Sequence, residues 1–156
     1  MVAALFVYLL AIVCWLGAII FFSAFVAPVV FTQLPIEEAG KVVSTIFPRY
    51  YVLGYVAGGI ASVLAIYFAI ERGPRLWWNG AALALAIALG LTVYAGVVVS
   101  PRVGEIRAVA EEQNPDPARR AEFDRLHHLS VVLNGAVLIL DLIALASTAA
   151  ALSRYG

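Results

Sequence analysis

The residues best suited to chemistry lie in one stretch near the C-terminus. Phe123–Asp141 contains the only two histidines, His127 and His128, and then enters an apolar run that keeps several polar side chains. At about 100° per helical residue, one polar set falls within an arc of roughly 60°. Its members are His127, Ser130, Asn134, Asp141 and Thr148. A polar stripe on an otherwise apolar helix indicates a side that faces protein or water.

Asp141 is the most informative member of this stripe because it lies near the middle of its apolar run. An ionised carboxylate at the centre of a bilayer costs several kcal/mol unless it is paired, hydrated or protonated. The functional interpretation is a cation or solute site built from Asp141, Asn134 and Ser130, with His127 at its mouth. The structural alternative is a protonated Asp141 that bonds to a neighbouring helix through Asn134 or Thr92.

His127 is also the candidate metal ligand, since histidine is a common ligand and a proton switch. His127 and His128 diverge by about 100° on a helix, so the pair does not easily chelate one ion. The alternative for both is capping or hydrogen bonding to Glu122 or Asp124.

Enzyme motifs are missing from the sequence. It has no HExxH, glycine-rich phosphate loop or nucleophile elbow, so no residue is assigned as catalytic. A haem clamped between two helices needs histidines on different helices, which one chain does not offer here. Of the two cofactors considered, a haem and a metal ion, the histidine positions disfavour the haem and leave the metal ion.

Composition assigns the chain to the membrane. Hydrophobic residues make up 63% and charged residues 13% of the 156 residues, against about half and a quarter in soluble domains. The net charge is zero, which gives no basic surface for nucleic acid. Four segments reach the length of about 20 residues that spans a bilayer: 5–31, 50–70, 76–99 and 129–152. We therefore expect one all-α domain, 1–156, a bundle of four transmembrane helices in a lipid bilayer.

Two further segments, 35–48 and 102–126, are expected to be amphipathic, with a break at 114–117. Small residues follow one face of each middle span and predict close helix packing, including a homo-oligomer. They are Gly54, Gly58 and Ser62 in the second span, and Thr92 and Gly96 in the third.

The two halves of the chain also resemble each other. Phe47–Tyr51 can be laid on Phe123–His127, and the same shift lays Gly59 on Gly135. Pro28 near the end of the first span corresponds to Pro101 just after the third span. This predicts two helical hairpins of like orientation, with the polar chemistry concentrated in the second.

Three short motifs carry a family resemblance: Phe25–Pro28, Phe47–Tyr51 and His127–Ser130 continuing to Asn134. In these the chain resembles the transmembrane protein 205-like family, and it is loosely similar to the copper-resistance D and HemJ-type membrane proteins. The resemblance implies a four-helix protein of the bacterial inner membrane, and its animal relative's link to platinum-drug resistance implies metal or drug handling. Haem-linked proteins of the HemJ type rely on a histidine and a lysine in their helices. This chain has no histidine in its first span and no lysine in any of its four spans.

The leading hypothesis from the sequence is therefore a membrane protein that binds or conducts a cation or small solute. One alternative is a structural or partner-binding module that docks through residues 102–125. A second alternative is a haem or metal redox protein.

Overall fold

All the elements of the computed structural model are helices, within the residues that it describes, 1–71, 75–110 and 117–153. The first half contains α1 (Val2–Phe21), the π-helical segment η1 (Phe22–Val26), α2 (Ala27–Gln33) and α3 (Ile36–Glu71). The second half contains α4 (Arg75–Tyr94), the π-helical segment η2 (Ala95–Val99), α5 (Ser100–Ala110) and α6 (Pro117–Ser153). Four helical stretches are long and apolar enough to cross a membrane, which confirms the all-α, four-span prediction.

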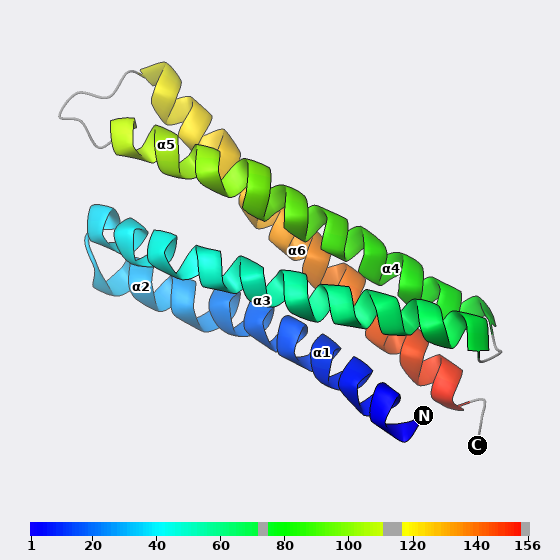
Figure 1. The fold of residues 1–156 in the computed structure, drawn as a ribbon. Helices are drawn as coiled ribbons and strands as arrows, with labels where there is room; N and C mark the ends of the chain where they lie inside the picture. The colour runs from blue at the N-terminus through cyan, green and yellow to red at the C-terminus, as the bar shows by residue number, and fades with distance from the viewer. Residues whose placement is uncertain (72–74, 111–116, 154–156) are drawn as a thin grey trace.

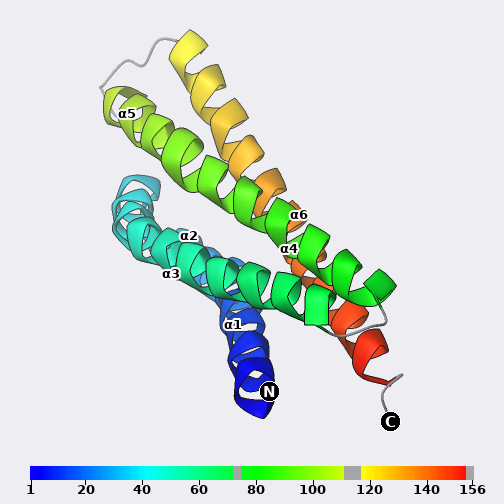
Figure 2. The ribbon, with the colours of Figure 1, turned by 45° about the vertical axis from the view of Figure 1, so that its right-hand side comes forward.

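The four long helices form a bundle in which α4 packs against both α3 and α6, while α1 packs against α3 and α6 (Figure 1). Both chain termini lie at one end, together with the end of α3 and the start of α4. At the other end, the pair α2–α3 and the pair α5–α6 diverge from each other (Figure 2). We call this the open end of the bundle.

The outside of the bundle is apolar, as a lipid environment requires. Large apolar side chains such as Phe6, Val13, Val63 and Ile139 are exposed on it. The inside holds an aromatic centre in which Tyr8, Phe68 and Trp78 are fully buried, with the Phe68 and Trp78 ring centroids 4.8 Å apart. The surface of the bundle thus matches lipid tails rather than water.

A π-helical segment stands directly before a proline in each half. Within them the N–H groups of Ala27 and Ser100 bond to carbonyls five residues earlier. Because Pro28 and Pro101 have no N–H, an α-helix would leave the carbonyl four residues before each proline without its donor. The observed π-helical bonds satisfy the carbonyls of Phe22 and Ala95, six residues before each proline. The helix continues through each proline, although proline commonly kinks or ends a helix.

Most residues on the buried faces of the two halves correspond in position, which supports the predicted repeat. The buried residues of α1 are Tyr8, Ala11, Ile12, Trp15 and Ile19, and one shift lays them on Ala81, Ala84, Leu85, Ala88 and Thr92, all buried in α4. The shift that lays Gly59 on Gly135 lays Ala57, Ala61, Ala65 and Phe68 on Leu133, Val137, Asp141 and Ala144, again all buried. α1 and α4 run in the same direction (Figure 1). Asp141 thus occupies the position that Ala65 has in the first half.

The expected amphipathic segments are continuous with the spans. Residues 36–48 form the first turns of α3, and Pro48 lies inside this helix on an exposed side, so its missing hydrogen bond costs the core nothing. Of the segment 102–126, the first part belongs to α5 and the last part to α6, and the predicted break at 114–117 lies outside the described residues except for Pro117. Near the open end, the Arg107 guanidinium of α5 donates to the Gly40 carbonyl of α3.

The small residues predicted to pack helices lie inside the single chain. A Cβ at Gly58 would come within 2.7 Å of the Trp15 ring, and one at Gly54 within 3.0 Å of the Thr92 methyl group. Gly96 is covered by the Tyr51 and Tyr55 rings. These three glycines therefore face side chains of their own chain, and the homo-oligomer stays a prediction.

Candidate functional site

Asp141 lies on the buried face of α6 and is completely inaccessible to solvent. Among the described residues, neither of its carboxylate oxygens has a hydrogen-bond partner. The two partners of the structural alternative bond to other groups: the Thr92 hydroxyl donates to the Ala88 carbonyl at 2.9 Å, and the Asn134 side chain bonds to Tyr50 and Ser23. Buried polar groups are normally satisfied. Asp141 is one of three exceptions among the described residues, with the Ser62 hydroxyl and the Trp78 ring N–H, and it is the acidic one.

Asn134 joins three helical segments through its side-chain amide. The Tyr50 hydroxyl of α3 donates to its Oδ1 at 2.5 Å, and its Nδ2 donates to the Ser23 Oγ of η1 at 2.9 Å. Ser23 stands in the π-helical segment, so the wider turn there helps to place a hydroxyl opposite α6. By the repeat, Asn134 takes the position of Gly58, which explains why this polar junction exists on only one side of the bundle.

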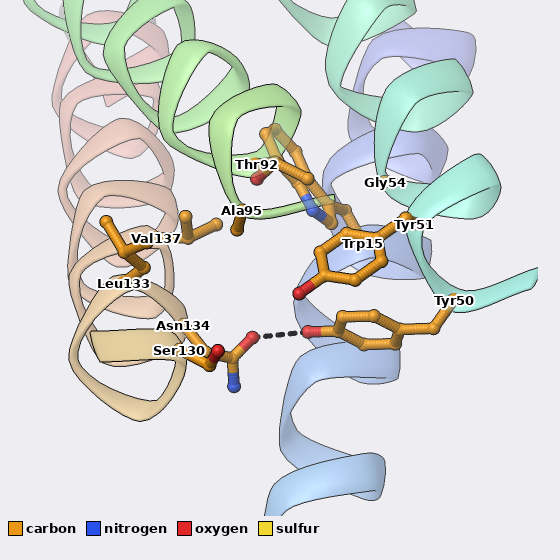
Figure 3. A pocket seen from close by; sticks show the side chains of 10 residues that line it. All are labelled: Trp15, Tyr50, Tyr51, Gly54, Thr92, Ala95, Ser130, Leu133, Asn134 and Val137. Carbon is orange, nitrogen blue, oxygen red and sulfur yellow. Dashed lines mark hydrogen bonds between the residues drawn. The ribbon is translucent and has the colours of Figure 1, made fainter. Parts of the chain in front are cut away.

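A small cavity lies beside this junction, between α3, α4 and α6. About 10 Å³ is open to the centre of a water-sized sphere, which is close to the least volume that holds one water molecule. Figure 3 shows the hydroxyls of Tyr50 and Tyr51 pointing toward α6, where Ser130 and Asn134 lie. The other lining residues are Trp15, Gly54, Thr92, Ala95, Leu133 and Val137.

The cavity and Asp141 are neighbours along α6. Val137 lines the cavity, and Asp141 follows it by one helical turn on the same buried face. The edge of the cavity nearest Asp141 therefore lies roughly one helical turn, about 6 Å along the axis, from the level of the carboxyl group.

Beyond Asp141, toward the end of α6, the last residue of the polar stripe is Thr148, which is hydrogen-bonded to Tyr8 of α1. The Thr148 hydroxyl donates to the Ala144 carbonyl at 2.8 Å, so it accepts the bond from the Tyr8 hydroxyl at 2.7 Å. Tyr8 and Thr148 are both buried, and the Tyr8 ring packs edge-on against Trp78 with centroids 5.8 Å apart. This side of Asp141 is filled by the bonded Tyr8–Thr148 pair and the Trp78 ring.

The histidines lie apart from this buried site. His127 and His128 are exposed on α6, and the His127 ring stacks on Phe123 with centroids 6.2 Å apart. Among the described residues, no group of three or more His, Cys, Asp or Glu side chains is arranged to hold a metal ion. The structure thus brings together Ser130 and Asn134 at the cavity and Asp141 one turn deeper, but leaves His127 outside.

Sequence reasoning missed the tyrosines of this site. Tyr50 and Tyr51 follow Arg49 at the start of an apolar run, which is typical of an anchor in the headgroup layer. The repeat held a usable signal, because it lays the glycines at 54 and 58 on Ser130 and Asn134. The second half thus carries polar residues where the first half has glycines, which marks the face of α6 on which this site lies.

The fold and the buried polar site define an integral membrane protein of four helices with a carboxyl group in its interior. The chain belongs to the family described as Domain of unknown function (DUF4149), whose model matches residues 10–112. That match begins inside α1, includes the second and third spans, and ends before α6. An uncharacterized protein of Aquifex aeolicus (strain VF5) is 30% identical over 129 residues, which are 82% of this chain and 83% of that protein. No solved structure matches the chain.

These comparisons confirm the sequence resemblance only at the level of a family of unknown function. They give no relationship to the transmembrane protein 205-like family or to the copper-resistance D and HemJ-type proteins.

Proposed function

We propose that this protein binds a cation at Asp141 and conducts it through the polar interior of the bundle. The observation that carries the proposal is the pair of unpartnered carboxylate oxygens on a side chain with no solvent exposure. Leaving such a group unpaired costs roughly 1–3 kcal/mol, and more when it is charged. A protein retains this cost where the group serves as a ligand or a proton carrier.

The surroundings of Asp141 give the proposed path a direction. Toward the open end, the cavity and its hydroxyl groups follow within one turn. Toward the termini, the Tyr8–Thr148 bond and the Trp78 ring fill the interior. We infer that the cation reaches Asp141 from the open end, and that passage beyond it requires the Tyr8–Thr148 contact to open.

Asp141 is the only charged side chain among the described buried residues. In the absence of another cation its carboxyl group therefore carries a proton, because an isolated buried charge is far more costly than a neutral acid. Binding then exchanges this proton for the incoming cation. The bacterial inner membrane and a role in metal resistance belong to the proposal through the family resemblance, and a homo-oligomer belongs to it through the small residues of the two middle spans.

The test is ion flux in liposomes that contain the purified protein. Sodium uptake and proton release are followed across an imposed gradient for the wild type and for Asp141→Asn, which keeps the size of the side chain and removes its ability to ionise. The matched control is Asp124→Asn, since Asp124 is exposed on the same helix. Flux that is lost in Asp141→Asn and kept in Asp124→Asn supports the proposal, and equal flux in all three proteins refutes it.

A further inference from the structure

Three exposed arginines lie at the open end of the bundle, just beyond its apolar surface. They are Arg49 in α3, Arg102 in α5 and Arg125 in α6. The nearest exposed large apolar side chains along the chain are, respectively, Val52, Val98 and Val131. At about 1.5 Å of rise per residue, the three arginines stand about 5, 6 and 9 Å past these valines along the helix axes.

These distances match the depth of the lipid headgroups. A bilayer measures about 40–45 Å with its headgroups and about 30 Å without them, which leaves about 5–8 Å for each headgroup layer. Arginine side chains are long enough to extend along an apolar surface toward this layer, so the guanidinium group of Arg125 also reaches it. We call Arg49, Arg102 and Arg125 the basic rim.

The described part of the chain does not neutralise the basic rim. No described carboxylate forms an ion pair with any of its three arginines. The nearest exposed carboxylates beyond the apolar surface, Glu105 and Asp124, stand about 10 Å past Val98 and Val131, and their short side chains do not extend back to the lipid. Arg49 donates to a backbone carbonyl of its own helix at 3.2 Å, but a guanidinium group has five N–H donors and keeps the others.

From this placement we infer that the basic rim is a binding surface for the headgroups of anionic phospholipids. A guanidinium group holds phosphate oxygens through two parallel N–H donors, and basic residues next to a span attract lipids of net negative charge. His127 and His128, exposed between Arg125 and the apolar surface, add N–H donors at the same depth. The acyl chains of such a lipid then lie on the exposed valines. This surface is independent of the proposed cation path.

The probe is phosphatidylglycerol, titrated onto the detergent-purified protein and counted by native mass spectrometry, with zwitterionic phosphatidylcholine as the comparison lipid. The test variant combines Arg49→Gln with Arg125→Gln and removes two charges of the basic rim. The matched control combines Arg119→Gln with Arg120→Gln, since these exposed arginines of α6 stand about 17 Å past Val131, beyond the headgroup layer. The test variant should bind phosphatidylglycerol roughly 30-fold more weakly than the wild type, and the control should bind it normally.

The outcomes separate the basic rim from charge in general and from a free anion. Binding that falls equally in the two double variants, or in neither, overturns the inference, as does a wild type that binds both lipids equally. Phosphatidylglycerol that inorganic phosphate displaces would overturn it too, because the rim would then be a site for a soluble anion. Circular dichroism shows whether each variant keeps the helix content of the wild type.

Discussion

The contact between α1 and α3 can be tested with two neighbouring glycines that differ only in what they face. A Cβ at Gly58 would stand 2.7 Å from Trp15 ring carbons and 3.1 Å from the Leu89 side chain, whereas one at Gly59 would meet nothing within 4 Å. Trp15 is almost fully buried, so its ring has little room to withdraw. Gly58→Ala should therefore be destabilising and Gly59→Ala should not.

The magnitudes follow from the two surroundings. Alanine is favoured over glycine inside a helix by about 0.5–1 kcal/mol, and Gly59→Ala should gain that amount. At Gly58 the same gain is opposed by overpacking, which costs about 1–3 kcal/mol. The free energy of unfolding of Gly58→Ala should thus fall below that of Gly59→Ala by roughly 1–3 kcal/mol.

The assay is reversible unfolding in mixed micelles with increasing sodium dodecyl sulfate, followed by tryptophan fluorescence. The two variants are chemically identical substitutions one residue apart, so each is the control for the other. Equal free energies of unfolding would refute the close packing of Trp15 on Gly58, and with it the described arrangement of α1 against α3.

Three further predictions use the same unfolding assay. Tyr8→Phe and Thr148→Val should each lower the free energy of unfolding by about 1 kcal/mol. The double variant should lose less unfolding free energy than the two single variants together, because both remove the same hydrogen bond. Strictly additive losses would show that the bond is absent. Tyr50→Phe should cost about 1–3 kcal/mol because it leaves the Asn134 oxygen without its donor, and a neutral result would contradict the three-segment junction. Asp141→Ala should be neutral or stabilising by about 1–3 kcal/mol, since it removes an unpartnered polar group; a clear loss of stability would reveal a hidden partner.

The membrane class and the number of spans could be predicted because they depend on composition and length alone. An apolar run in lipid has to satisfy its backbone internally, so its only local choice is a helix. The sequence did not predict that these helices are continuous, because Pro28, Pro48 and Pro101 lack a backbone N–H and normally interrupt a helix. In the structure Pro48 lies on an exposed side of α3, and a π-helical segment precedes Pro28 and Pro101. Local sequence does not encode these features clearly.

The candidate site could be predicted on the helix that carries it but not across the bundle. Helical spacing correctly placed Asn134 and Asp141 on one protein-facing side of α6, yet it also included His127, which is exposed. The arc from spacing is wide enough to hold both a buried and an exposed residue. Tyr50 and Ser23 reach Asn134 from distant parts of the chain, and only tertiary packing determines such pairs.

The most direct test of the proposed function is the ionisation of Asp141 itself, observed by infrared difference spectroscopy of the protein in lipid. Spectra are compared without and with saturating sodium, for the wild type, Asp141→Asn and the exposed-site control Asp124→Asn. We expect sodium to remove the C=O stretching band of a protonated carboxyl group and to produce carboxylate bands in the wild type and the control, but not in Asp141→Asn. Identical difference spectra for the wild type and Asp141→Asn would show that Asp141 does not bind the cation.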